Sequence, residues 1–207
     1  MRRTKEEAAL TEQAILDAAV SVFTSKGFND TRLEDIAANA GVTRGAIYWH
    51  FENKLDIFIH LITSSLKRYE AIIIREIQKN NTPVTTLRSV LTEVLKSDPE
   101  SDSLTGLFQL HLPGLLMDSS KGETLHAAVS QIMQRINDLL LAVVYNGVDA
   151  GQIRTDIRPN EILLFITASL KGIMDERLRV FTGQVFTGDY TQFVDMVISG
   201  ICANNDE

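Results

Sequence analysis

Apolar residues recur at intervals of three and four along most of the chain, which is the spacing of one buried face of an α-helix. The first such stripe ends at Gly27 and consists of Ile15, Ala18, Ala19, Val22 and Phe23. A second, shorter stripe ends at Gly41 and consists of Leu33, Ile36, Ala37 and Ala40. A glycine directly after an apolar stripe is typical of a helix C-terminus. The pattern therefore predicts two consecutive helices, and the small side chains of Ala37 and Gly41 predict a close crossing with the next helix.

Polar residues mark where the next helices are expected to begin. Thr31 and Glu34 have the T-x-x-E spacing of a capping box, so we expect a helix from Arg32. Thr43 is suited to cap another short helix after Gly41. The residues of that helix that would pack back onto Ile36 and Ala37 lie four apart and are Ile47 and Phe51. Two short helices joined by a tight turn predict a helix-turn-helix.

The rest of the chain keeps the helical spacing. Asn53 is suited to cap a long helix that runs to about Lys79, and Thr82 with Pro83 opens another. Further helices are expected at about 104–112, 122–147, 159–182 and 189–203. We find no credible strand and no internal repeat. The sequence therefore predicts an all-α protein, with a helix-turn-helix domain at residues 1–52 and a helical domain at residues 53–207.

The short helix after Thr43 gathers hydrogen-bond donors of the kind that contact DNA. Arg44 is able to donate two hydrogen bonds to guanine O6 and N7 in the major groove, or to bridge a phosphate. Gly45 and Ala46 lack bulk, so the backbone would be able to approach the bases and Ala46 to touch a thymine methyl. A well-packed helix start explains these two small residues equally well. The other donors on this helix are Tyr48, Trp49 and His50.

The run GVTRGAIYWHF, with a lysine at position 54, closely resembles the DNA-binding domain of the TetR family, and within it the AcrR-like repressors of multidrug efflux. The resemblance is dense over residues 3–58, and beyond about Ile62 it extends only to length and helical character. It implies phosphate contacts from donors that position a protein on DNA, namely Thr43, Tyr48, Trp49, His50 and Lys54. Thr31 is a further candidate for a phosphate, although capping alone would account for it.

The negative net charge of the chain is unusual for a protein that is expected to bind DNA. The chain has a net charge of −7, and residues 1–60 hold seven Lys and Arg against nine Asp and Glu, a net charge of −2. A domain that binds DNA is usually basic. Affinity must therefore depend on where the cations lie, and we expect DNA binding that weakens strongly with salt.

Composition and motifs exclude several other classes. A chain of 207 residues with 44% hydrophobic content can bury the core of one or two domains, and it has neither an apolar run of about 18 residues nor a signal region. We therefore expect a cytoplasmic protein that makes no membrane contact. Cys202 is the single cysteine, the four histidines are isolated, and the common catalytic and nucleotide-binding motifs are missing. We expect no metal, no cofactor and no enzyme activity.

The resemblance also implies that the C-terminal helices form a homodimer and bind an inducer. A single short recognition helix makes few contacts, so a dimer that reads two half-sites is physically expected. The last two helices are the expected interface, with an apolar stripe formed by Phe193, Met196, Val197 and Ile201. Packing of that stripe inside the protomer is the alternative, and both are compatible with the sequence.

Polar groups set among apolar residues mark a candidate ligand site. The candidate residues for binding a largely apolar ligand are Leu66, Phe108, His111, Met133, Asn137 and Thr167. Core packing of the histidine and the methionine, and solvent exposure of Asn137, would explain them without a ligand. Pro113 and Gly114 are expected to form a hinge beside this site.

Together these features predict a dimeric repressor that a small, largely apolar inducer releases from a palindromic operator, with an efflux or transport gene as target. A helical carrier protein and an activator of the same fold are the alternatives.

Overall fold

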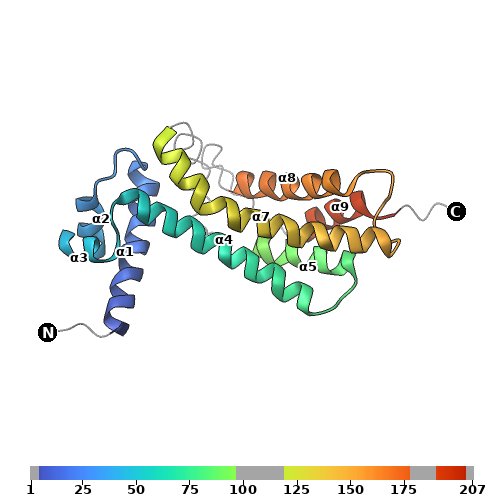
Figure 1. The fold of residues 1–207 in the computed structure, drawn as a ribbon, viewed down its shortest axis with the longest axis horizontal. Helices are drawn as coiled ribbons and strands as arrows, with labels where there is room; N and C mark the ends of the chain where they lie inside the picture. Colours follow the sequence, from blue (N-terminus) through green and yellow to red (C-terminus); the bar gives the residue numbers. More distant parts are fainter. Residues whose placement is uncertain (1–4, 97–118, 178–189, 204–207) are drawn as a thin grey trace. The chain divides into compact units, whose positions relative to one another are not determined.

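The computed structural model describes residues 5–96, 119–177 and 190–203, and every regular element in these ranges is a helix (Figure 1). The contacts divide the described residues into an N-terminal unit, residues 5–65 with 119–129, and a C-terminal unit, residues 66–96 with 130–177 and 190–203. The helices are α1 (Lys5–Lys26), α2 (Leu33–Ala40), α3 (Arg44–His50), α4 (Lys54–Gln78), α5 (Pro83–Lys96), α7 (Ser119–Asp149), α8 (Pro159–Arg177) and α9 (Thr191–Ile201). The predicted all-α fold is confirmed for the described part of the chain.

The N-terminal unit is built around α1, which packs against α2 and α3. The predicted stripe of α1 is buried, as are the inward residues expected on α2 and α3, Ile36, Ala37, Ile47 and Phe51. Three phenylalanines close this core, because the ring centroids of Phe23, Phe28 and Phe58 lie 5.2 to 5.9 Å apart. Tilted and edge-to-face rings at this separation attract each other beyond their burial. The apolar pattern of the sequence thus places this core correctly.

The start of α2 differs from the prediction by one residue. Arg32 is the N-cap, and its amide donates to the Asp35 carboxylate at 2.9 Å. Thr31 is buried and donates its hydroxyl to the carbonyl of Gly27 at 2.6 Å. The predicted capping box of Thr31 with Glu34 is therefore wrong, because the threonine hydroxyl is used inside the preceding turn and Asp35 replaces Glu34 as the acidic partner.

Gly41 ends α2 as predicted, with a left-handed backbone at φ +66°. Its amide and that of Val42 donate to carbonyls of the last turn, those of Ala38 and Ala37 respectively. A side chain at this glycine would meet no atom within 4 Å. The expected close crossing at Gly41 is therefore wrong, and the backbone conformation alone favours glycine here.

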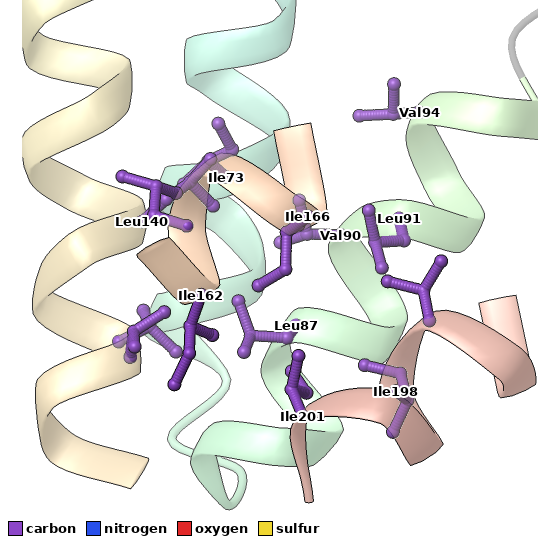
Figure 2. Packing of buried hydrophobic residues seen from close by; sticks show 14 of the residues in the cluster. Ile73, Leu87, Val90, Leu91, Val94, Leu140, Ile162, Ile166, Ile198 and Ile201 are labelled. Carbon is purple, nitrogen blue, oxygen red and sulfur yellow. The ribbon is translucent and has the colours of Figure 1, made fainter. Parts of the chain in front are cut away.

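The C-terminal unit packs α5, α7, α8, α9 and the end of α4 around one apolar core. Figure 2 shows Ile162 and Ile166 of α8 between Leu140 of α7 and the α5 residue Leu87, with Ile198 of α9 beside α5. The predicted inward residues of α5 are all buried, namely Leu87, Val90, Leu91, Val94 and Leu95. The helical spacing of the sequence therefore identified the buried face of α5 without any tertiary information.

The predicted helix starts after the recognition helix are also confirmed. The Asn53 side chain accepts from the amides of Leu55 and Asp56 at 2.9 and 3.0 Å, and Thr82 accepts from Thr85 at the start of α5. At the other end of the C-terminal unit, Ile153 and Cys202 form an isolated antiparallel bridge. The helix expected at 104–112 and the end of the helix expected at 159–182 lie outside the described residues. No helix in the described ranges is long and apolar enough to cross a membrane.

Candidate nucleic-acid interface

The helix α3 presents one apolar residue inward and its donors outward. Thr43 caps it as predicted, since the hydroxyl oxygen accepts from the Ala46 amide at 3.1 Å. Ile47 is fully buried against the N-terminal unit. On the other side Tyr48 is 48% exposed and Trp49 is 71% exposed, and Arg44 is also exposed. A capped helix with this polarity is suited to lie in a groove of DNA.

Arg44 is held at the surface by two neighbours. Its guanidinium donates to the Tyr48 hydroxyl at 2.8 Å and forms an ion pair with the Glu34 carboxylate. The hydrogen bond that Arg44 donates to Tyr48 is the largest cause that raises the pKa of Arg44, and the charge of Glu34 is the second. The guanidinium is therefore charged and oriented in the free protein, and it must leave Glu34 before both of its edges can meet a base.

Gly45 leaves the backbone of α3 open to solvent. A side-chain carbon built at this position would meet only Thr43 Oγ1, at 3.8 Å, which is an ordinary contact. Nothing inside the protein therefore requires glycine here. The missing side chain instead leaves room for another molecule to approach the backbone.

His50 points into the protein, unlike the other donors of α3. Its side chain is only 4% exposed, and Nδ1 lies 3.6 Å from the Glu12 carboxylate of α1. Nε2 is buried without a hydrogen-bond partner in the described part of the chain. The same carboxylate lies 3.7 Å from His60 Nε2. The sequence contained no signal for this arrangement, because Glu12 is distant in the chain and only the packing of α1 brings it near.

Thr31 and Lys54 also direct their donors inward. The Thr31 hydroxyl donates to the Gly27 carbonyl, and the Lys54 ammonium donates to the backbone carbonyls of residues 28, 29 and 31. Together with His50, three of the residues predicted to contact phosphates have their side-chain donors inside the N-terminal unit. Periodicity could not show this, since it predicts a face of a helix and not the partners of a long side chain.

Two acidic residues of this unit, Asp35 and Asp56, are used internally, which lessens the repulsion expected from its negative charge. Lys26 donates to Asp35 at 2.7 Å, and this hydrogen bond is the main cause that lowers the pKa of Asp35. Asp56 accepts from the amide of Glu52 at 3.0 Å. Carboxylates that are paired or hydrogen-bonded within the protein repel a nucleic acid less than free ones at the same distance.

Comparison with known proteins assigns this unit. Residues 15–61 match the family described as bacterial regulatory proteins, tetR family, and this range contains α2, α3 and the start of α4. Over these residues the chain is similar to the TetR family. The match covers the donors of α3, so the helix-turn-helix of the structure is the part of the chain that resembles these regulatory proteins.

Two curated relatives are named as regulators of transcription. The chain is 55% identical over 75 residues to the HTH-type transcriptional repressor BepR of Brucella suis biovar 1 (strain 1330), which is 36% of each chain. It is 42% identical over 97 residues to the HTH-type transcriptional regulator AcrR of Shigella flexneri, which is 46% of this chain and 45% of the relative. These matches thus span only about a third to a half of each relative, and none of these names denotes an enzyme.

A solved structure of the SmeT–triclosan complex has the same fold. The TM-score is 0.76 at 24% identity, and the alignment covers 94% of this chain and 93% of SmeT. SmeT is described as the repressor of the Stenotrophomonas maltophilia multidrug efflux pump SmeDEF. The similarity to SmeT therefore extends over both units of the chain, and at this identity it concerns the fold.

The residues predicted to bind a ligand do not share one environment. Leu66 is partly buried and packs against the C-terminal core, and Thr167 donates its hydroxyl to the Leu163 carbonyl of its own helix at 3.0 Å. Met133 is 40% exposed and Asn137 is exposed on α7. Phe108 and His111, with the expected hinge at Pro113 and Gly114, lie outside the described residues. The ligand site therefore stays a prediction.

Proposed function

We propose that this protein is a ligand-responsive transcriptional repressor that binds a palindromic operator as a homodimer. The observation that carries the proposal is the exposed donor face of α3, with Arg44, Tyr48 and Trp49 outward and Ile47 buried beneath them. The similarity to BepR and AcrR, whose names denote a repressor and a regulator, supports the proposal. As in other bacterial regulators of transcription, the protein would act in the cytoplasm, where the chromosome lies.

Base recognition falls to the first turn of α3 in this proposal. Arg44 donates two hydrogen bonds to a guanine, while Gly45 and Ala46 let the backbone come close to neighbouring base edges. Thr43, Tyr48 and Trp49 contact phosphates and fix the helix in the groove. The buried or engaged donors of Thr31, His50 and Lys54 are not part of this contact set.

The dimer forms through α8 and α9. The predicted stripe is divided in the structure, because Val197 and Ile201 are buried inside the protomer while Met196 is 73% exposed. Leu164 and Phe165 of α8 are 66% and 46% exposed. A side chain at Gly200 would lie 3.4 Å from the Phe165 ring, so α9 passes directly beside that ring. These exposed apolar residues form the surface that a second copy would cover.

The ligand acts on the helical part of the chain, residues 53–207, and the DNA-binding domain is residues 1–52. The proposed contacts are Leu66, Phe108, His111, Met133, Asn137 and Thr167. An inducer releases the operator only if it binds more tightly to the conformation that does not fit DNA. SmeT, which shares this fold, has been solved with triclosan, a small and largely apolar compound. An efflux or transport gene is accordingly the proposed target.

Fluorescence anisotropy of labelled DNA tests the first part of this proposal. The purified protein is titrated onto fragments from around its own gene, across a salt series, with an unrelated fragment of equal length as control. Trp49 is the single tryptophan of the chain, and its change in emission reports the same binding without a label. We expect tight binding to one fragment that weakens steeply with salt. Equal, weak binding to all fragments would contradict the proposal.

The ligand response is tested on the operator found in this way. Small apolar compounds are added to the preformed complex, and the loss of anisotropy is followed at constant salt. Binding of the compound to the protein alone, followed by calorimetry, separates release by a ligand from displacement by a compound that binds DNA. A compound that binds the protein and leaves DNA affinity unchanged is not an inducer.

A further inference from the structure

Lys54, the first residue of α4, places its ammonium group among three carbonyls of the turn between α1 and α2. The Nζ atom lies 2.7 Å from Phe28 O, 2.8 Å from Asn29 O and 2.9 Å from Thr31 O. It also lies 4.8 Å from the centroid of the Phe28 ring. An ammonium group has three N–H donors, and here each has a carbonyl within hydrogen-bond distance.

The carbonyls converge because the turn is itself fixed. Gly27 has a left-handed backbone at φ +81°, and its carbonyl accepts the hydroxyl of the buried Thr31. Phe28 anchors the turn in the aromatic core of the N-terminal unit. Backbone carbonyls that point to one spot need a donor, and a compact cation with three hydrogens satisfies three of them at once.

From this geometry we infer that Lys54 is a positioning residue that fastens the first turn of α4 to the turn before α2. The inference rests on the proposed function, because the turn that Lys54 holds leads directly into α2 and α3, the helices proposed to bind DNA. The ammonium holds α4 at the base of the helix-turn-helix, so the orientation of α2 and α3 depends on it without any contact between Lys54 and DNA. The positive charge of Lys54 is used inside the protein.

A phosphate contact would require a different arrangement. The ammonium would exchange strong hydrogen bonds to carbonyls for bonds to a phosphate, and carbonyls of the turn would lose a partner. The hydrogen bonds to residues 28 and 31 are part-buried, and leaving such acceptors without a donor costs more than an exposed phosphate contact returns. The inward position is therefore the one that should persist on DNA.

Substitution by arginine separates the two roles. Lys54→Arg keeps the charge, but a planar guanidinium cannot direct three hydrogens to three carbonyls around one point, whereas it binds phosphate at least as well as lysine does. We expect Lys54→Arg to lose roughly tenfold or more in operator affinity, with the slope of log affinity against log salt unchanged. Lys26→Arg is the matched control, since Lys26 forms an exposed pair with Asp35 in the same unit, and it should bind as the wild type does.

Nuclear magnetic resonance of the free wild-type protein provides a measurement that needs no variant. With ¹⁵N-labelled lysine, we expect the Lys54 ammonium to exchange its hydrogens slowly and to show coupling through hydrogen bonds to the carbonyl carbons of residues 28, 29 and 31. The exposed Lys5 serves as the reference for fast exchange. Addition of operator DNA should leave the Lys54 signal in place.

Two results would overturn the inference. The first has two parts. Lys54→Arg binds the operator with full affinity, and in Lys54→Met the slope of log affinity against log salt is smaller than in the wild type, by about 0.9 for each Lys54 that contacts a phosphate. The other is a Lys54 ammonium that exchanges as fast as that of Lys5. If Lys54→Arg does not fold, the wild-type spectrum decides. Failure of the wild type to bind any operator would instead contradict the proposed function, and the spectrum of the free protein would still test the position of Lys54.

Discussion

Single side chains on α2 and α3 determine how this protein would meet DNA. Arg44, the residue that we expect to read a base, is paired in the free protein with Glu34 and hydrogen-bonded to Tyr48. Tyr48 belongs to the same helix and is able to move with Arg44 onto the DNA. Glu34 carries a negative charge on α2 and would repel the phosphates, so its pairing with Arg44 competes directly with DNA binding.

We therefore expect Glu34→Gln to bind the operator more tightly, by about two- to fivefold at low salt, because the exposed ion pair no longer competes for Arg44. Anisotropy titrations at two salt concentrations measure the effect. Glu52→Gln removes the same charge from another exposed position of this unit and is the control. An equal gain in both variants would mean that total charge, and not the pairing of Arg44, sets the affinity.

Gly45→Ala tests whether the backbone of α3 approaches the bases. The added methyl group has room inside the protein, and alanine is favoured over glycine within a helix by about 1 kcal/mol. We expect an unchanged or raised thermal midpoint together with a loss of roughly tenfold or more in operator affinity, the cost expected for a displaced recognition helix. Gly172→Ala on α8, where a methyl group meets no described atom within 4 Å, is the control: its thermal midpoint should also be unchanged or raised, and its DNA binding should stay as in the wild type. Retained affinity in Gly45→Ala would show that the backbone stays away from the bases.

At the scale of elements, charged contacts tie α4 to its neighbours in the C-terminal unit. Arg135 of α7 donates to Glu70 at 2.7 Å, and Arg75 donates to Glu93 of α5 at 3.0 Å. Glu76 is fully buried at the side chain and accepts from Lys79 at 2.7 and 2.8 Å and from Arg75 at 3.1 Å. The last turns of α4 are thus held by ion pairs as well as by the apolar core.

These contacts predict a dependence of stability on pH. Lys79 first, and Arg75 with it, lower the pKa of Glu76 against the opposing effect of burial, and Arg135 lowers the pKa of Glu70. A carboxyl group whose pKa is lower in the folded state stabilises the fold above its unfolded pKa of about 4.3, and this contribution is lost as pH falls through the folded pKa. We therefore expect the free energy of unfolding to be level from pH 7 to about pH 5 and to fall below it.

Glu76→Gln isolates one of these carboxylates. The variant should lose about 2 kcal/mol at pH 7, the net value of hydrogen bonds to a charged group, and the difference from the wild type should shrink towards pH 3. Urea unfolding at constant protein concentration measures both curves, since the stability of a dimer depends on concentration. Glu123→Gln, exposed on α7, should follow the wild type. Parallel curves for Glu76→Gln and the wild type would rule out a lowered pKa at Glu76.

At the scale of the whole molecule, dimerisation would convert a weak recognition helix into an operator-binding protein. One α3 helix of 7 residues reaches few bases, and two of them related by a two-fold axis read both halves of a palindrome. The exposed apolar residues of α8 and α9 are the candidates for the interface around that axis. Dimerisation and operator affinity should therefore fail together.

We expect Leu164→Glu to convert the dimer into monomers and to weaken operator binding by roughly a hundredfold or more, because a charge would be buried in an apolar interface. Sedimentation velocity and anisotropy on the same sample measure the two effects. Leu10→Glu is matched in exposure, at 69% against 66%, but lies on α1, so it should leave the oligomeric state unchanged. A dimeric Leu164→Glu protein would place the interface elsewhere.

The sequence by itself determined the helices, their inward faces and most of their ends. Thr43, Asn53 and Gly41 act on neighbours within a few residues, so their roles follow from local hydrogen bonding and backbone conformation. The predicted capping box failed where two local solutions competed, because both Glu34 and Asp35 were available to α2 and the tertiary position of Thr31 decided between them. The TetR resemblance rested on the same local residues and is confirmed over residues 15–61.

Tertiary structure alone decided what the long polar side chains contact. His50 meets Glu12 of α1, Lys54 meets carbonyls that precede it by 23 to 26 residues, and Arg44 meets Glu34 of α2. The helical period specifies which face a residue occupies, but a side chain several bonds long can reach outward or inward from the same position. Whether such a group is left free for a phosphate or used within the fold depends on which backbone and side-chain groups the packing of α1, α2 and α4 brings within its reach.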